Sequence, residues 1–194
     1  EDGRFGGPQQ RMLVIASELR KKNIEVEIII PKDETEIFKK KLIENKIKFH
    51  ELSITRLSLK INFLIKYIFL FFYEIFMLVN FFKKNKYDLI QANSTPQFKA
   101  VIAAFILKIK IVWVIEDSYF PFFIVFIFKN LSKLTNCKII YTSQRVYDFY
   151  FKNKKNIKNS KKEIFAPIDF LRFNLNQTFD TPNYINKKKF IVTT

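Results

Sequence analysis

The sequence predicts an α/β fold, a Rossmann-like three-layer α/β/α arrangement in which helices cover both faces of a parallel sheet. Short apolar runs such as 26–30, 109–115 and 138–141 alternate with longer stretches of helical character, as strands buried on both faces do. The helical stretches can supply the crossover connections that parallel strands require. Proline cannot donate to a β-ladder, so it belongs where a strand has ended. Four prolines follow the runs directly or within a few residues: Pro31, Pro96, Pro121 and Pro167.

These patterns fix the expected elements, beginning with an amphipathic helix over 8–22, where apolar residues recur at helical spacing. The stretch 152–162 holds six lysines and no acidic residue, so it is expected to be a loop. The remaining expected elements are strand 25–30, helix 34–45, strand 47–52, helix 58–84, strand 87–92, helix 96–108, strand 111–115, helix 120–135, strand 138–142 and helix 143–151.

The chain divides into one domain and the beginning of another. Residues 1–173 are expected to form the Rossmann-like domain. Residues 174–188, rich in Asn, Thr and Lys, are expected to be an interdomain linker, and 189–194 to begin a further domain. The chain starts at Glu1 and no strand precedes its glycine-rich start. We therefore expect an internal piece of a longer protein that lacks the first strand of this domain.

Composition excludes several classes of protein. Hydrophobic residues make up 48% of the 194 residues and charged residues 27%, which excludes a largely disordered chain. The single cysteine, Cys137, excludes a disulfide framework and suits a reducing compartment. One histidine and one cysteine exclude a zinc site of the Cys/His kind.

The net charge of +16 makes an anionic partner worth considering. Part of this excess has a simpler source, because Lys, Asn, Ile and Phe are the residues that AT-rich codons supply. Nucleic acid is not the expected partner, since it calls for basic and aromatic side chains on one exposed face. Here the aromatic residues lie in apolar helices and the lysines in loops.

Two very apolar helices need an explanation. The stretch 59–82 is dominated by Ile, Leu and Phe, and its polar residues are expected on one half of the helix. The alternatives are a buried crossover helix, an in-plane membrane contact and, least in accord with the charges, a membrane-spanning helix. The polar residues that interrupt the stretch are Lys60, Asn62, Lys66, Glu74 and Asn80.

The second apolar stretch, 120–128, is rich in Phe and is followed by Lys129 and Lys133. It is too short to span a bilayer alone. Phenylalanine-rich surface beside lysines is typical of a protein resting on anionic lipid. The two apolar stretches could instead simply pack together.

The first candidate site is the glycine-rich start. All three glycines lie within the first seven residues, and Pro8 suits the first turn of a helix. Glycines gathered in one place indicate a need for backbone freedom. A loop of Gly6 and Gly7 opening a helix offers free amides and the positive end of a helix dipole, to which Arg11 adds a charge, so it could bind a phosphate. The alternative is a tight turn only, and the spacing does not complete a dinucleotide fingerprint.

The second candidate site follows the strand at 111–115. Glu116 and Asp117 stand at its carboxyl end, where ligands bind in open α/β sheets. Either carboxylate could orient or deprotonate a hydroxyl, so both are candidate catalytic residues, with Ser118 beside them as a candidate binding residue. The alternative is capping of the next helix by Asp117 or Ser118.

The third candidate site follows the strand at 87–92. Gln91, Asn93 and Ser94 carry amides and a hydroxyl that could bind the hydroxyls of a sugar. Capping of the following helix by Ser94 or Thr95 would explain the same residues.

Two further features are expected to have no function. His50 ends a strand with no evident partner and is interpreted as a bystander. Glu36 and Glu44 are eight residues apart on an amphipathic helix, a common spacing that is interpreted as a coincidence.

Several segments together resemble the family-4 glycosyltransferases. Each match is weak alone, but they occur in the order of that family and cover almost the whole chain. Gln91, Asn93 and Glu116 stand where the family often has histidine, and Ala166 and Pro167 replace Asn-Gly. The segments that carry the resemblance are 6–11, 19–26, 87–94, 112–117, 139–146 and 164–169 with Phe173.

The resemblance implies the N-terminal, acceptor-binding half of a GT-B fold, with the donor domain following in the chain. It implies transfer of a hexose-type sugar from a nucleotide-sugar donor with retention and without a metal or other cofactor. Gly6 and Gly7 would approach the donor diphosphate, and Asp117 would lie near the acceptor hydroxyl. It also implies a lipid-linked or envelope polysaccharide acceptor and a peripheral position on the cytoplasmic face of an anionic plasma membrane. The alternative is a non-catalytic membrane-binding module derived from such a domain.

Overall fold

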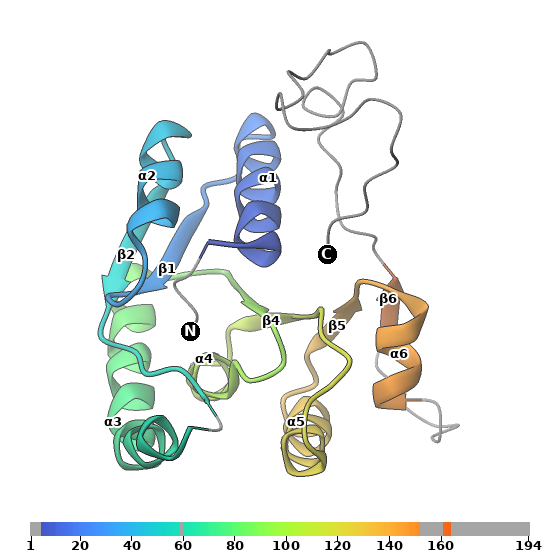
Figure 1. Ribbon diagram of the computed structural model, residues 1–194. Coiled ribbons are helices and arrows are strands. Elements are labelled where there is room, and N and C mark those ends of the chain that lie inside the picture. Colours follow the sequence, from blue (N-terminus) through green and yellow to red (C-terminus); the bar gives the residue numbers. More distant parts are fainter. Residues whose placement is uncertain (1–4, 59, 152–160, 164–194) are drawn as a thin grey trace, which may run out of the picture.

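The computed structural model describes residues 5–58, 60–151 and 161–163, and helices and strands alternate along them (Figure 1). The expected helices and strands are all present, and their ends agree with the sequence to within three residues. The elements are α1 (Gly7–Lys21), β1 (Glu27–Pro31), α2 (Glu36–Glu44), β2 (Lys48–Leu52), α3 (Ile61–Asn85), β3 (Leu89–Asn93), α4 (Phe98–Ile106), β4 (Lys110–Ile115), α5 (Phe122–Leu134), β5 (Lys138–Tyr141), α6 (Gln144–Phe151) and β6 (Lys161–Glu163).

Every strand pair in the described residues is parallel, which confirms the predicted fold class. The strands form two sheets, one of order β1-β2 and one of order β3-β4-β5-β6. Because crossover connections are right-handed, consecutive neighbours in the second sheet place α4, α5 and α6 on one face. Helix α3 packs against α4 and joins this layer. Figure 1 shows α1 and α2 above the sheets and α3, α4 and α5 below them.

The main hydrophobic core lies between the four-stranded sheet and the lower helices. Trp113 of β4 is its centre and is fully buried. Its ring makes edge contacts with Phe98 of α4 and Phe128 of α5, at centroid distances of 6.0 and 4.8 Å. A smaller core cluster holds α1 and α2 against β1. The packing of the main core positions β3 and β4, and the polar residues of the candidate site lie where these two strands end.

Strand β6 corrects one prediction, because Lys161 and Lys162 lie in a strand and not in a loop. They pair with Ile139 and Ile140 of β5. Strand pairing uses backbone groups, and lysine is common on edge strands, so charge alone did not exclude a strand there. The predicted linker at 174–188 and the predicted domain start at 189–194 lie outside the described residues.

Helix α3 also departs from expectation at one position. Lys60, Asn62, Lys66 and Asn80 are exposed, as an amphipathic helix requires, but Glu74 is 1% exposed. Of the five polar residues expected on one half of the helix, Glu74 is therefore the one that is buried. The side of α3 that packs inward buries Tyr67, Glu74, Ile75, Leu78 and Phe82.

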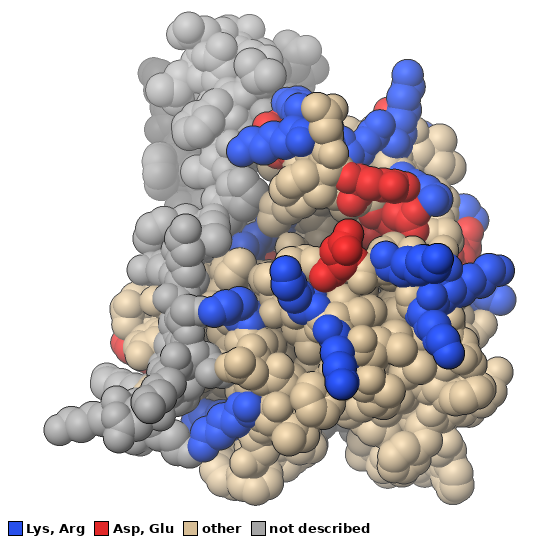
Figure 2. All heavy atoms as spheres, turned by 180° about the vertical axis from the view of Figure 1, so that it is seen from behind, with Lys and Arg blue, Asp and Glu red and all other residues tan. Residues whose placement is uncertain are grey.

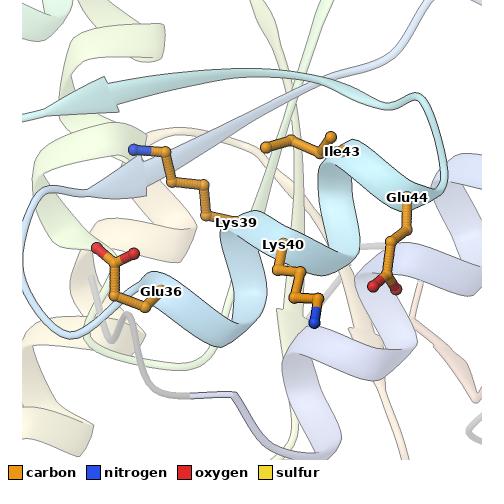
Figure 3. A pocket seen from close by; sticks show the side chains of 5 residues that line it. All are labelled: Glu36, Lys39, Lys40, Ile43 and Glu44. Atoms are coloured by element: carbon orange, nitrogen blue, oxygen red, sulfur yellow. The ribbon is translucent and has the colours of Figure 1, made fainter.

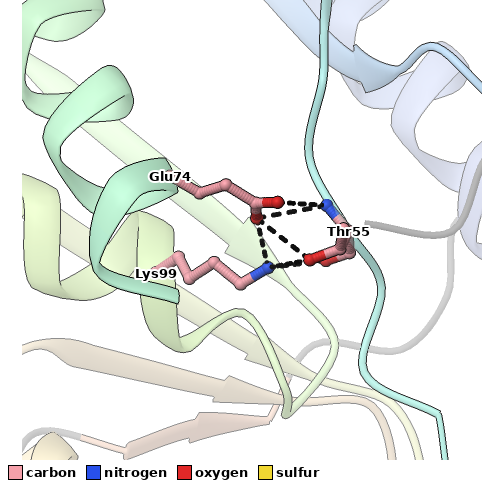
Figure 4. A network of polar contacts seen from close by, with 3 residues as sticks. All are labelled: Thr55, Glu74 and Lys99. Atoms are coloured by element: carbon pink, nitrogen blue, oxygen red, sulfur yellow. Dashed lines mark hydrogen bonds and ion pairs between the residues drawn. The ribbon is translucent and has the colours of Figure 1, made fainter. Parts of the chain in front are cut away.

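The buried Glu74 forms a polar network that ties three segments together (Figure 4). Lys99 of α4 donates to Glu74 Oε2 at 2.5 Å and to the carbonyl oxygen of Thr55 at 2.6 Å. The backbone N–H of Thr55 donates to both Glu74 carboxylate oxygens, at 3.0 and 3.1 Å. The ammonium of Lys99 also lies 3.9 Å from the centre of the Tyr67 ring. The network holds the segment after β2 against α3 and α4.

Candidate functional site

The glycine-rich start forms the first turn of α1. Pro8 stands within that turn, where its missing N–H costs nothing. The side-chain oxygen of Gln9 accepts a hydrogen bond from the Gly6 N–H at 3.1 Å, which helps the helix begin there. Gly6 and Gly7 are both exposed.

Neither described glycine needs unusual backbone freedom, which corrects the prediction. Gly6 has extended backbone, with φ of −158°, and no described glycine has positive φ. A Cβ added at Gly7 would meet no atom within 4 Å, and one at Gly6 would lie 3.6 Å from Gln9 Oε1, an ordinary contact. Steric demands of the described chain therefore do not explain the two glycines, and the space beside Gly7 is open.

Arg11 lies one turn further along α1 and pairs with Glu116 at the end of β4. Its Nη1 donates to Glu116 Oε1 at 3.1 Å, and the two side chains are 7% and 11% exposed. Burial raises the pKa of the Glu116 carboxyl, and the Arg11 guanidinium opposes that rise. The buried Nε of Arg11 has no hydrogen-bond partner in the described part of the chain. Among the described residues, this donor of a largely buried guanidinium is thus left without a partner.

Asp117 and Ser94 meet beside this pair. Ser94 Oγ lies 3.4 Å from Asp117 Oδ2 and donates to it. Strand β4 fixes the backbone of Ser94: its N–H donates to the Val114 carbonyl at 2.9 Å, and its carbonyl accepts from the Trp113 indole at 3.0 Å. Ser94 has φ of 77°, a left-handed conformation unusual for serine. The hydroxyl is therefore held where β3 and β4 end.

Gln91 and Asn93 lie two residues apart on β3 and so share one face of the strand. The Gln91 side-chain amide donates to Asn93 Oδ1 at 2.9 Å. Both side chains are half-buried, whereas the residues between and before them pack into the core. Ser118 is also half-buried and lies in the loop between β4 and α5.

Helix capping does not explain these residues. Helix α4 begins at Phe98 with Gln97 as its N-cap residue, and α5 begins at Phe122 with Pro121 in that position. Neither helix has a side-chain capping hydrogen bond. The capping alternatives for Ser94, Asp117 and Ser118 are therefore wrong. Thr95, the fourth candidate cap, instead shares a buried 2.8 Å hydrogen bond with the Tyr150 hydroxyl.

The structure thus brings predicted residues from three separate segments to one edge of the sheet. The start of α1 meets the end of β4 through Arg11 and Glu116, and the end of β3 meets it through Ser94 and Asp117. The edge carries one guanidinium, two carboxylates, a hydroxyl and the start of a 15-residue helix. Such an edge can hold an anion near the helix start and a hydroxyl near Asp117.

Sequence reasoning missed the partners of His50. Its Nε2 lies 2.8 Å from Glu27 Oε2, which also accepts from the Tyr87 hydroxyl at 2.6 Å. The Lys48 ammonium pairs with the same carboxylate. Burial of Glu27 works to raise its pKa, but hydrogen bonds from these three side chains outweigh burial and lower the pKa to about 2. His50 is therefore part of a structural cluster joining β1, β2 and the segment between α3 and β3.

Glu36 and Glu44, whose spacing was interpreted as a coincidence, line the same hollow beside α2. Figure 3 shows the two carboxylates near opposite ends of α2, beside a shallow hollow, with Lys39 and Lys40 between them. Glu44 pairs with Lys41 at 2.9 Å.

Within the residues that the structure describes, no three His, Cys, Asp or Glu side chains gather as a metal site would require.

Comparison with known proteins gives the family. No curated protein matches the chain. The model of Glycosyltransferase Family 4 matches residues 5–161, a range that begins before α1 and ends in β6 and so includes every residue of the candidate site. The chain therefore belongs to glycosyltransferase family 4, as its glycine-rich start and the ends of β3 and β4 predict.

Proposed function

We propose that this chain is the acceptor-binding domain of a glycosyltransferase that moves a hexose-type sugar from a nucleotide-sugar donor to a lipid-linked or envelope polysaccharide acceptor. The transfer retains the anomeric configuration and needs no metal or other cofactor. The donor is held mainly by a further domain, and the enzyme works at the cytoplasmic face of the plasma membrane. The observation that supports this most is the Arg11–Glu116 pair, which joins the start of α1 to the carboxyl end of β4.

The start of α1 is the proposed contact for the donor diphosphate. As the glycosidic bond to the donor breaks, negative charge grows on the leaving diphosphate. Backbone amides at a helix start and the helix dipole stabilise such charge, most strongly where water is excluded. The open space beside Gly7 admits a phosphate closely. The unused Nε of Arg11 adds a donor one turn away.

Glu116 then acts on Arg11 and not on the acceptor. Its carboxylate accepts from Nη1 and so fixes the guanidinium plane. The carboxylate also offsets part of the positive charge, which lets a guanidinium remain 7% exposed before donor binds. In this scheme Glu116 is a positioning residue for the diphosphate contact.

Asp117 is the proposed contact for the acceptor hydroxyl. Its carboxylate already accepts from Ser94 Oγ and can accept a second hydrogen bond from the acceptor. Gln91, Asn93 and Ser118 provide the surrounding amide and hydroxyl groups. Holding the acceptor oxygen close to the anomeric carbon supplies the proximity on which the rate of transfer depends.

The test is Gly7→Val in the full-length enzyme. Because a Cβ at Gly7 meets no atom within 4 Å, the variant should fold as the native protein does, with an unchanged melting temperature. A valine side chain would occupy the space proposed for the diphosphate. We expect kcat/KM for the donor to fall by about 100-fold or more.

Native donor turnover by Gly7→Val would refute the diphosphate role. A full-length protein that binds membranes but neither binds nor turns over any nucleotide-sugar would instead support the non-catalytic alternative.

A further inference from the structure

The lower helices leave two rows of large apolar side chains in solvent, which we name the aromatic face. Phe69 and Phe72 of α3 are 82% and 80% exposed, and Phe122 of α5 is 82% exposed. On α3 the residues recur at helical spacing and so form one stripe. The aromatic face consists of Ile65, Ile68, Phe69, Phe72 and Phe76 of α3 and of Phe122, Phe123, Phe126 and Ile127 of α5.

The two rows belong to one layer of the molecule. Helix α3 packs against α4, and α4 and α5 cover the same face of the four-stranded sheet because their crossovers run in one direction. On the face that Figure 2 draws, the lower part carries few charged side chains outside the grey residues, and most of the lysines and arginines lie above it. Exposed apolar surface of this extent marks an interaction site and is unusual on a free surface.

The exposure arises because α3 is long compared with the body it covers. Its 25 residues span about 37 Å, whereas β3 has five residues and spans about 17 Å. Over the first half of α3, residues 61–73, only Tyr67 is buried. The core therefore packs against the second half of α3. The aromatic stripe of the first half stays uncovered in the described structure.

Lysines adjoin both rows. The last turn of α3 carries Lys83 and Lys84, and the last turn of α5 carries Lys133. Lys66 is exposed on α3 beside the stripe. An aromatic row that ends in lysines matches the two layers of an anionic lipid surface, in which acyl chains accept the rings and headgroups accept the ammonium groups. The net charge of +16 favours the same partner.

The buried side of α3 indicates whether the helix would cross the bilayer or lie in its surface. By length and composition, α3 is the one helix in the described part of the chain that could cross a membrane. However, its other side holds Glu74 in contact with Lys99 at 2.5 Å and packs Leu78 and Phe82 into the core. Crossing a bilayer would break this buried ion pair and expose the core, whereas lying in the surface would leave both intact.

We propose that the aromatic face docks in the plane of an anionic lipid bilayer, with the rings of α3 and α5 in the acyl boundary and the flanking lysines among the headgroups. In a parallel α/β fold each helix begins at the carboxyl edge of the sheet. The uncovered first half of α3 and the Phe-rich start of α5 therefore lie toward the edge that carries Ser94 and Asp117. Docking would bring that edge close to the headgroup layer.

The role of the acceptor in this arrangement rests on the proposed function. A lipid-linked acceptor would reach Asp117 while its lipid stays in the membrane. The docking itself does not depend on catalysis, because vesicle binding is measured with no donor present. Failure of sugar transfer and failure of docking are therefore separate results.

The experiment is vesicle flotation of the full chain with phosphatidylcholine vesicles that contain about one-third phosphatidylglycerol. The test variant is F69S/F72S/F122S. The matched control is I37S/I43S on α2, where the two isoleucines are 64% and 61% exposed but lie in the other helical layer. A second control, F69L/F72L/F122L, keeps apolar side chains at the tested positions.

We expect the serine variant to lower the vesicle partition coefficient by about 100-fold or more, while both controls bind as the native chain does. Replacing the three lysines as K66Q/K83Q/K133Q should lower it by about 100-fold, and K22Q/K32Q/K40Q should change it less. Pure phosphatidylcholine should retain much less protein. All variants alter exposed side chains, and circular dichroism will confirm that they fold.

Binding that is equal in native chain and serine variant would overturn the proposal. So would a serine variant that loses self-association while its vesicle binding is unchanged, since a second copy would then cover the face. Extraction of the native chain only by detergent, and not by high salt together with alkaline pH, would overturn the in-plane arrangement in favour of a spanning helix.

Discussion

Lys99 Nζ lies 2.5 Å from Oε2 of Glu74, and neither side chain is more than 1% exposed. The pair joins the middle of α3 to the first turns of α4, and Thr55 closes it from the segment after β2. A charged pair in this position is unexpected on a helix as apolar as α3. It fixes the rotation of α3 about its axis, and so determines which side of the helix faces solvent.

Removing one partner of this pair should destabilise the domain strongly. Lys99→Met leaves the Glu74 carboxylate buried without its cation, and the free energy of unfolding should fall by about 3–5 kcal/mol. The double variant Lys99→Met/Glu74→Leu should lose less than the single one, because no uncompensated charge remains. Urea denaturation measures both, and a double variant that is no more stable than Lys99→Met would contradict the argument.

Acid should weaken the cluster around Glu27. The pKa of Glu27 is about 2 in the folded chain, below its ordinary value of 4.5. A depressed carboxyl pKa contributes stability that is complete above about pH 5 and is lost as the pH falls toward 2. Glu27→Gln should therefore reduce the free energy of unfolding by on the order of 2 kcal/mol at pH 7.

The same variant should show a weaker loss of stability than the native chain between about pH 5 and pH 2. Thermal unfolding at a series of pH values measures this difference, and parallel curves for the two proteins would show that Glu27 does not carry the effect. Glu25, exposed and near the same strand, offers a matched control in Glu25→Gln.

Arg11 and Glu116 should differ in their effect on transfer. Arg11→Ala removes a proposed contact to the diphosphate and should lower kcat/KM for the donor by about 100-fold or more in the full-length enzyme. Glu116→Gln keeps a hydrogen-bond acceptor for Arg11 and should lower it by about tenfold. Steady-state kinetics with varied donor make the comparison, and a larger loss for Glu116→Gln than for Asp117→Asn would assign the acceptor role to Glu116.

The end of α3 offers a stabilising substitution. Lys86 caps the helix with φ of 54° and ψ of 51°, and its N–H donates to the Phe82 carbonyl. This left-handed conformation costs a residue with a Cβ about 1 kcal/mol, and glycine is the usual residue there. Lys86→Gly should raise the free energy of unfolding by up to about 1 kcal/mol. Lys84→Gly, within the helix, should lower it by a similar amount.

The elements were predictable because their signals are local. Apolar runs such as 109–115 and prolines after strands report on neighbouring residues only, and they located β4 and its flanking helices to within two residues. The sequence patterns missed β6 because Lys161 and Lys162 interrupt any apolar run. Its backbone nevertheless pairs with β5. The pattern did not indicate that Glu74 is buried, because the partner that makes its burial tolerable is Lys99 on α4.

For the candidate site, the sequence indicated single positions and not their contacts. It placed Asp117 and Ser94 after neighbouring strands, at the carboxyl ends where ligands bind. That Arg11 would pair with Glu116, 105 residues away, depends on the packing of α1 over the sheet, which no local pattern encodes. The same holds for His50, whose partner Glu27 lies on the neighbouring strand.

The way β4 holds Ser94 affects the free energy of the proposed acceptor binding. The main chain of Ser94 is held at both its N–H and its carbonyl by β4, and its φ is 77°. Little conformational entropy remains to be lost at this position when a sugar arrives. If a sugar binds at this edge as proposed, its affinity should be limited by the freedom that the sugar itself gives up, and tethering that sugar to a two-dimensional surface would reduce that loss.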